Sequence, residues 1–487
     1  MKLISLVLII FLTSLNVTLG QKSIQGSIDK FSKDPDLKHA SISFKVVELE
    51  TNTTVAKLNS NLSLPTASIV KLFSTATALE LLGANYRAKT RVYYDGYIDS
   101  SGVLIGNLWI RGGGDPSLGS KYFNSESKQR QFLQIWTERI IEYGIKRVEG
   151  SIIADASEFG YNGAPDGWIW SDLGNYYGAG PSGLTIYDNM LQFHFRTGST
   201  AGQKASINSI NPEVQGMSFR NYVTSSKRRG DNTYIYGAPY SLERFATGTL
   251  PVNKSDFVVK GSLPDPEYQC AYELEKVLQQ NSISVSGGIK SARQMAIKTS
   301  VSDYAKRTMI VAHEGEKLID IINQTNMRSI NLFAEHMISL IGYEKTGNGS
   351  TESGLAVLDN YWKTKFDIQG MHVNDGSGLS RTNALSATNF VALLIQMNKS
   401  NNSKAFMNSL PVAGISGTLR SVCKGQTAHN RMHAKSGSMR RIKSYSGYIN
   451  ATSGKKYAFA LIVNNHSCSS SALTRKMEVV FNTIAGN

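Results

Sequence analysis

The sequence predicts an α/β domain in which helices flank a sheet and a large, strand-rich insertion divides the chain. A strand-like run at 42–49 and the runs that close the chain can share one sheet. The stretch from about 87 to 303 is rich in short strand-like runs and turns, and helical patterns resume from about residue 304. With 487 residues, the chain has room for roughly two to four domains.

Residues 1–20 have the pattern of a secretory signal peptide. Lys2 gives the positive start, Leu3 to Leu12 the apolar run, and Thr18 to Gly20 a small-residue cleavage site. A membrane anchor is disfavoured because the apolar run is short, and no later segment is apolar enough to span a bilayer. We expect a protein secreted across the inner membrane, periplasmic or extracytoplasmic, and at most peripheral to the membrane.

The first candidate catalytic pair is Ser68 and Lys71. Residues three apart share a helix face, so the hydroxyl and the amine come within hydrogen-bonding reach. We expect Thr66 to cap this helix and Gly83 to end it. A serine becomes a good nucleophile when a neighbouring base accepts its proton, and lysine can do so when its pKa is lowered. Alone, the motif is better explained by a capped helix with a solvated lysine.

The insertion is expected to begin near Arg87. Its strand-like runs are 90–94, 103–111, 148–154, 190–196 and 256–260, with helical patterns at 129–143 and 272–280. The glycines at 112–114 are not followed by Gly-Lys-Ser/Thr, so a tight turn is preferred to a phosphate loop. If Ser68 is a nucleophile that becomes acylated and Ser329 supplies a second hydroxyl, the two must converge, and so long a segment between them must contain folded, inserted domains.

A second motif is Ser329-Ile330-Asn331, followed by a helical pattern. A hydroxyl near the nucleophile can pass a proton to a leaving amine, while the Asn331 amide can hold the Lys71 amine or a substrate amide. The alternative is a helix cap. Further helical patterns lie at 316–323 and 354–363.

A third motif is Lys435-Ser436-Gly437-Ser438, which is predicted to lie on an edge strand of a hairpin. The glycine lets a substrate approach the backbone, and Lys435 can meet a carboxylate. The backbone N–H of Ser438, together with that of Ser68, can stabilise an oxyanion. The alternative for Lys435 is an exposed strand lysine.

The net charge and the spacing of basic residues and histidines indicate which classes of partner the protein can bind. The net charge of +15 favours anionic neighbours, which outside a cell are wall polymers or lipid headgroups; a basic surface without a partner is the alternative. The run 227–229 is short and lacks interleaved aromatic residues, so no nucleic acid is expected. The histidines at 336 and 433 lack metal-ligand spacing, and no cofactor or metal is expected.

The three cysteines, Cys270, Cys423 and Cys468, are too few for a disulfide framework. Cys423 with Cys468 is the preferred pair because both lie in the C-terminal region, but the sequence leaves the pairing open.

The ordered set of three motifs resembles the penicillin-binding proteins and serine β-lactamases. The segments 111–118, 374–381 and 410–419 are similar to signatures of the D-alanyl-D-alanine carboxypeptidase/endopeptidase family, the S13 type of class C penicillin-binding protein, of the penicillin-binding protein 4 type. The resemblance spans the mature chain. Ile330 and Ser436 depart from the commoner residues without removing a required functional group.

The resemblance implies a transpeptidase-like fold of the β-lactamase/penicillin-binding protein class. The catalytic domain would comprise 21–86 and 304–487, an inserted domain 87–189 and 266–303, and a nested domain 190–265. The implied activity is that of a serine D,D-peptidase acting on peptidoglycan stem peptides, with β-lactams as covalent inhibitors.

In the implied mechanism, Lys71 takes the Ser68 proton, Ser68 attacks the peptide carbonyl, and water later releases the shortened peptide. Ser329 passes a proton to the departing D-alanine, Asn331 orients neighbouring groups, and Lys435 engages the terminal carboxylate. The predicted substrate-binding residues are Ser436, Gly437, Ser438, Met439, Asp375, Ser377 and Leu379. For the last three a glycine-rich turn is the alternative, and for Met439 it is core packing.

Two other functions remain open, a serine β-lactamase and a wall-binding scaffold whose inserted domains matter more than catalysis. The sequence does not set the balance of carboxypeptidase and endopeptidase action, the third residue of the peptide or the oligomeric state.

Overall fold

The computed structural model describes residues 24–296 and 301–487, so the predicted signal peptide lies outside the described residues. Two compact units are present. Among the described residues, unit 1 combines those up to Leu81 with Ile322–Ser329 and Leu358–Asn487, and unit 2 combines those from Leu82 to Ile321 with Ile330–Val357. The division into a catalytic, an inserted and a nested domain at the boundaries given above stays a prediction. Within the described ranges, no helix combines the length and apolarity needed to cross a membrane.

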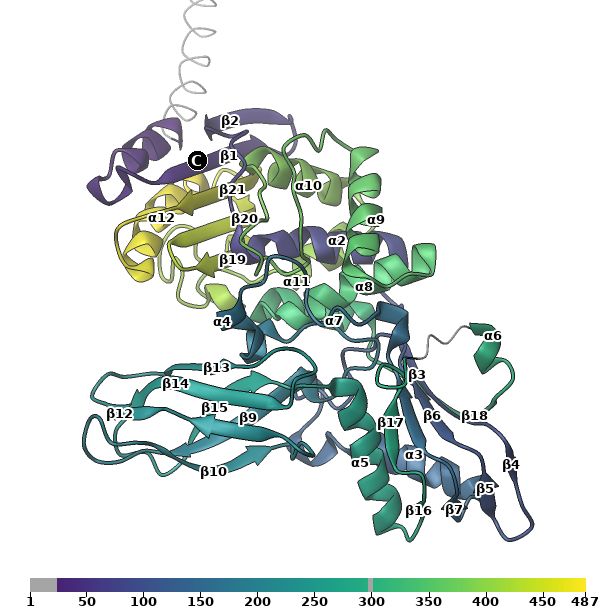
Figure 1. Ribbon diagram of the computed structural model, residues 1–487. Helices are drawn as coiled ribbons and strands as arrows, with labels where there is room; N and C mark the ends of the chain where they lie inside the picture. The colour runs from purple at the N-terminus through teal and green to yellow at the C-terminus, as the bar shows by residue number, and fades with distance from the viewer. Residues whose placement is uncertain (1–23, 297–300) are drawn as a thin grey trace, which may run out of the picture. The chain divides into compact units, whose positions relative to one another are not determined.

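Unit 1 is built on a five-stranded antiparallel sheet with the order β19-β20-β21-β1-β2 (Figure 1). Its strands are β1 (Ser41–Glu48), β2 (Thr53–Leu58), β19 (Met432–Met439), β20 (Ile442–Asn450) and β21 (Lys456–Asn464). The N-terminal strand therefore joins the C-terminal hairpin, as the sequence predicts, and β19 forms one edge of the sheet.

Helices cover both faces of this sheet (Figure 1). They are a helix over residues 24–32, α2 (Lys71–Leu82), α10 (Ala387–Lys399), α11 (Ser403–Ser409) and α12 (Ser470–Ala485). Alternation along β21 explains the layering: Phe459 and Leu461 join the core under α12, and the intervening Ala460 faces the other way, where α10 packs. Helix α2 is embedded by Phe73, whose ring meets those of Trp362 and Phe390 edge-on.

Unit 2 contains several small sheets. The largest is mixed and has the order β17-β8-β6-β3-β18. Its strands are β3 (Lys89–Tyr94), β6 (Leu108–Arg111), β8 (Ile152–Asp155), β17 (Ile289–Ser291) and β18 (Thr308–Glu314). A second sheet comprises β4 (Tyr97–Ile98), β5 (Val103–Ile105), β7 (Arg147–Val148) and β16 (Ser284–Val285).

The other two sheets of unit 2 come from the middle of the chain. One comprises β9 (Met190–Arg196), β10 (Ser206–Asn211) and β15 (Phe257–Ser262). The other comprises β11 (Ser218–Asn221), β12 (Thr224–Ser226), β13 (Asn232–Tyr236) and β14 (Glu243–Pro251). The runs predicted at 103–111 and 148–154 are each two strands, because the chain turns at Gly106 and Gly150, where the Gly150 N–H donates to the Gly106 carbonyl.

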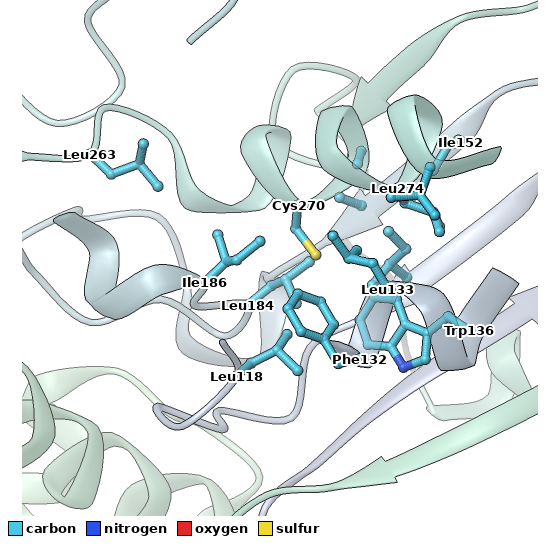
Figure 2. Close-up of a cluster of buried hydrophobic side chains, with 14 of the residues drawn as sticks. Leu118, Phe132, Leu133, Trp136, Ile152, Leu184, Ile186, Leu263, Cys270 and Leu274 are labelled. Atoms are coloured by element: carbon cyan, nitrogen blue, oxygen red, sulfur yellow. The ribbon is translucent and has the colours of Figure 1, made fainter. Parts of the chain in front are cut away.

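A large apolar core holds unit 2 together, with Cys270 and Leu274 of α5 (Pro266–Gln280) facing Phe132 and Trp136 of α3 (Gln131–Glu142) (Figure 2). Helix α5 begins where Asp265 accepts the N–H of Tyr268 and proline occupies the first turn. The remaining α-helices are α4 (Trp170–Leu173), α6 (Val301–Tyr304), α7 (Leu318–Arg328), α8 (Asn331–Thr346) and α9 (Thr351–Lys363).

The preferred disulfide is not formed, because the three cysteines are free. Cys423 is buried in the apolar core of unit 1, and burial raises the pKa of its thiol to about 12. Cys468 is only partly buried, and its Sγ lies 4.0 Å from Nδ1 of His466. A thiol held neutral in an apolar core is a poor partner for disulfide formation, which proceeds through the thiolate.

Candidate active site

Ser68 and Lys71 are brought together at the start of α2. Lys71 Nζ lies 2.9 Å from Ser68 Oγ and donates to the carbonyl oxygen of Ser377 at 2.6 Å. Lys71 is fully buried, whereas Ser68 is partly exposed. The predicted pair is therefore in contact, with its hydroxyl open to a ligand and its amine shielded.

The start of this helix differs from the expectation. Ala67–Val70 form a 3₁₀ turn before α2, and the Thr66 side chain makes no capping hydrogen bond. Its Oγ1 instead donates to the carbonyl oxygen of Ala67 at 3.1 Å, so the predicted cap is wrong. Ala67 has a φ of +47°, a strained value for a non-glycine residue. Gly83, with a φ of +85°, follows the end of α2 as predicted.

The loop from Asp375 to Ser380 supports the pair from within unit 1. Asp375 is buried, and its carboxylate accepts the backbone N–H groups of Gly378 and Ser380 at 2.7 and 2.6 Å. This loop presents the Ser377 carbonyl to Lys71 and the Gly376 carbonyl to Ser74 Oγ. Asp375 and Ser377 thus hold the loop beside the nucleophile, and Leu379 is half-buried; contact of any of them with substrate stays a prediction.

The third motif lies directly against the Ser68 turn. A Cβ on Gly437 would lie 3.0 Å from Ser68 N and 2.7 Å from the Thr66 carbonyl oxygen. It would also lie 2.3 Å from Ser444 Oγ, which donates to that same carbonyl at 2.6 Å. Glycine is therefore required here because the strand and the turn approach each other so closely.

Lys435 is buried, which excludes the exposed strand lysine. Its Nζ donates to Ser329 Oγ at 2.9 Å and to the Ser436 carbonyl at 2.8 Å. Burial lowers the pKa of Lys435 well below that of a free lysine, and the charges of Lys71 and Lys443 lower it further. Ser329, with a φ of +60°, is a second strained position in the site.

The outer edge of β19 is partly occupied. The Ala434 N–H donates to the Pro411 carbonyl, away from β20. Because N–H directions alternate along a strand, the N–H groups of Ser436 and Ser438 point to this same edge. Beside them, Ser436 Oγ donates to Thr418 Oγ1 at 2.8 Å, and Thr418 is exposed. The site thus offers two backbone donors and two hydroxyls along one edge.

The other two predicted residues are Asn331 and Met439. Asn331 belongs to unit 2, where its Nδ2 donates to the Tyr177 carbonyl at 2.8 Å. Met439 ends β19 and is half-buried. Their contact with substrate stays a prediction.

Thr418 and Ser444 were not singled out from the sequence. The register of the β19–β20 hairpin places Ser444 opposite Gly437, so its position could have been found by assuming a tight turn after Met439. Thr418 lies within the segment 410–419 that resembles a family signature, but the sequence does not reveal its contact with Ser436, which arises only when this loop packs beside the edge strand.

Residues 24–483 match the D-Ala-D-Ala carboxypeptidase 3 (S13) family. The chain belongs to this family. It is 26% identical over 456 residues to the D-alanyl-D-alanine carboxypeptidase of Actinomadura sp. (strain R39), covering 91% of this chain and 81% of that protein. It is 22% identical to D-alanyl-D-alanine carboxypeptidase DacB of Haemophilus influenzae, covering 88% and 86%.

The fold is similar to that of penicillin-binding protein 4 (dacB) from Haemophilus influenzae, with a TM-score of 0.79, 20% identity and coverage of 92% of this chain and 97% of that one. The family, the fold class and the enzyme class predicted from the sequence are confirmed: the S13 type, a penicillin-binding protein fold and a serine-type D-Ala-D-Ala carboxypeptidase.

Proposed function

We propose that this chain hydrolyses D-alanyl-D-alanine termini of peptidoglycan stem peptides through an acyl-enzyme on Ser68. The observation that carries this proposal is the contact between Ser68 Oγ and the buried Lys71 Nζ, set against Gly437 of the edge strand. A nucleophile, a shielded amine and an open strand edge are the parts that acyl transfer to a serine requires.

Acylation begins when the lone pair of a neutral Lys71 amine takes the Ser68 proton. The Ser377 carbonyl accepts a hydrogen bond from Lys71 Nζ and so keeps the amine in place during the proton transfer. Ser68 Oγ then forms a bond to the peptide carbonyl carbon, and the backbone N–H groups of Ser68 and Ser438 receive the developing oxyanion. Burial, and then the charge of Lys71, lowers the pKa of the neighbouring Lys435, so a state in which both buried amines are charged is disfavoured.

Departure of D-alanine requires a proton on its nitrogen. Ser329 Oγ accepts a hydrogen bond from Lys435, so its own O–H is free to point at the leaving amine. Ser329 donates that proton as the C–N bond breaks and recovers one from Lys71, which becomes neutral again. Lys71 then takes a proton from a water molecule whose oxygen attacks the ester carbon, and it returns this proton to Ser68 Oγ as the ester C–O bond breaks and the shortened peptide leaves.

The open half of the β19 edge would receive the substrate as an added strand. Main-chain hydrogen bonds to Ser436 and Ser438 would supply affinity. The terminal carboxylate would meet the hydroxyls of Ser436 and Thr418, and Lys435 is buried behind this edge. Asn331 would orient the substrate amide, and Asp375, Ser377, Leu379 and Met439 would complete or support the site.

The same chemistry would let β-lactams acylate Ser68, and would let the enzyme cleave D-alanine cross-links. One of the similar structures, 17% identical with a TM-score of 0.73, is penicillin-binding protein 4 of Haemophilus influenzae complexed with a novel β-lactam. Peptidoglycan is the proposed partner, together with an anionic wall or membrane surface that the positive net charge would favour. We place the protein outside the inner membrane.

The test is D-alanine release from an N-acylated D-Ala-D-Ala peptide and from a cross-linked muropeptide, followed by mass spectrometry. The wild type should release D-alanine, Ser68→Ala should not, and Ser453→Ala, which alters an exposed serine of the same unit, should match the wild type. Cleavage of the cross-linked dimer would assign endopeptidase action. Rapid turnover of a chromogenic β-lactam would favour a β-lactamase instead, and equal release by Ser68→Ala would refute the proposal.

A further inference from the structure

A polar hollow lies on the face of the five-stranded sheet of unit 2 that points away from the apolar core. Val92 of β3 and Ile110 of β6 point into the apolar core, which includes Ile152 (Figure 2). Side chains alternate along a strand, so the neighbours of Val92 and Ile110 on each strand face the opposite side of the sheet. The hollow has a volume of about 400 Å³, in the range of small-molecule sites. We call it the β3 hollow; Tyr86, Arg87, Arg91, Arg111, Glu158 and Tyr343 line it.

Two arginines oppose each other in the β3 hollow. Arg91 and Arg111 are direct partners in the antiparallel register of β3 and β6. Like charges in this arrangement repel and destabilise a sheet. Arg111 is compensated by its ion pair with Glu158 at 2.5 Å. The side chain of Arg91 has neither an ion pair nor a hydrogen bond among the described residues, and its charge also acts on Glu158.

Glu158 supplies the complementary unused group. Its side chain is only 7% exposed, and Oε1 accepts from Arg111 and from the Tyr343 hydroxyl at 3.0 Å. Its buried Oε2 accepts no hydrogen bond within the described part of the chain. A buried carboxylate oxygen without a donor is costly, and a ligand that brings a donor relieves that cost.

The other charged groups at the β3 hollow have partners. Arg87 Nη1 donates to the Gly315 carbonyl, Lys89 pairs with Glu314, and Glu344 accepts the Tyr86 hydroxyl at 2.8 Å. The unused capacity is therefore one cation, Arg91, and one carboxylate oxygen, Glu158 Oε2. The hollow is bordered by tyrosine rings, which suit a small aliphatic group.

We propose that the β3 hollow binds a zwitterionic α-amino-acid head group. Arg91 receives the carboxylate in the forked geometry that a guanidinium offers, and Glu158 Oε2 accepts from the ammonium. Two ligands could supply such a head group: D-alanine released at Ser68, and the free end of a diamino acid in a stem peptide. The choice of these two ligands rests on the proposed function, whereas the site itself does not.

The experiment is titration calorimetry of the full mature chain with D-alanine, and with a soluble stem peptide that carries a free diamino-acid end. N-acetyl-D-alanine removes the ammonium and D-alaninamide removes the carboxylate, so each should bind at least about tenfold more weakly than D-alanine. Arg91→Gln should weaken zwitterion binding by a similar factor. Arg91→Lys keeps the positive charge but cannot form two parallel hydrogen bonds to a carboxylate, so its affinity should lie between those of Arg91→Gln and the wild type. Arg220→Gln, an exposed arginine of the same unit, is the matched control and should bind as the wild type.

Stronger binding of the stem peptide than of D-alanine would assign the stem peptide as the source, and the reverse would assign the released product. Equal binding by Arg91→Gln and wild type, equal binding of N-acetyl-D-alanine and D-alanine, or no binding of either zwitterion would overturn the proposal. Penicillin labelling of Ser68, measured in parallel, should be unchanged in Arg91→Gln. Absence of labelling in the wild type itself would instead count against the proposed function, while leaving the calorimetric result interpretable.

Discussion

Replacing Gly437 with alanine tests the packing of the edge strand against the nucleophile. The added Cβ would meet Thr66 O at 2.7 Å and Ser68 N at 3.0 Å, both rigid backbone atoms. It would also meet Ser444 Oγ at 2.3 Å, and rotation of that hydroxyl would break its bond to Thr66 O. The strand and the Ser68 turn must therefore separate by some tenths of an ångström.

Overpacking of this kind costs about 1–3 kcal/mol, and losing the buried Ser444 hydrogen bond adds about 1 kcal/mol, so unfolding should become about 2–4 kcal/mol easier. Because the Ser68 and Ser438 N–H groups lie on the two surfaces that separate, acylation should slow by about 10- to 100-fold even in fully folded protein.

The assay pairs chemical denaturation with the second-order rate of labelling by a fluorescent penicillin. Gly26→Ala is the matched control, since a Cβ at Gly26 meets nothing within 4 Å and the residue lies in a helix. That change should leave labelling unaltered and stabilise the protein by up to about 1 kcal/mol. Wild-type labelling and stability in Gly437→Ala would refute the packing argument.

Three further predictions concern the same site. Ser329→Ala should lower kcat for D-alanine release by about 10²- to 10⁴-fold with little change in KM, because a proton donor is lost; an unchanged kcat in steady-state kinetics would remove Ser329 from the mechanism. Burial lowers the pKa of Lys435 in the folded protein, so between that pKa and the ordinary value near 10.4 the unfolded chain binds more protons than the folded one. The free energy of unfolding of the wild type, relative to that of Lys435→Met, should therefore rise with pH through this window and stay constant below it. A difference in denaturation midpoints that stays flat from pH 7 to 10 would contradict this prediction. Thr418→Val should raise KM for a peptide carboxylate about 5- to 30-fold while kcat stays within a few-fold, and equal KM values would show that the carboxylate binds elsewhere.

Local geometry made the first part of the site predictable. Ser68 and Lys71 are three residues apart in helical backbone, so helix periodicity alone places their side chains within reach of each other. The edge position of β19 followed from the hairpin pattern of the C-terminal strands. The family resemblance then linked motifs that periodicity could not bring together.

Tertiary packing determined what sequence reasoning missed. The burial of Lys435 and its bond to Ser329 depend on segments far apart in the chain. Thr66 has the right residue type for a cap, but its carbonyl is engaged by Ser444 and its turn is 3₁₀, so the local preference was overridden. Asn331 follows Ser329 closely in sequence, yet it groups with unit 2.

The central claim is that Ser68 becomes acylated, and intact-mass measurement after exposure to benzylpenicillin tests it most directly. We predict one adduct per wild-type chain, located on the peptide containing Ser68, the same adduct on Ser453→Ala, and none on Ser68→Ala. An adduct of the same stoichiometry on folded Ser68→Ala, or none on the folded wild type, would contradict the account.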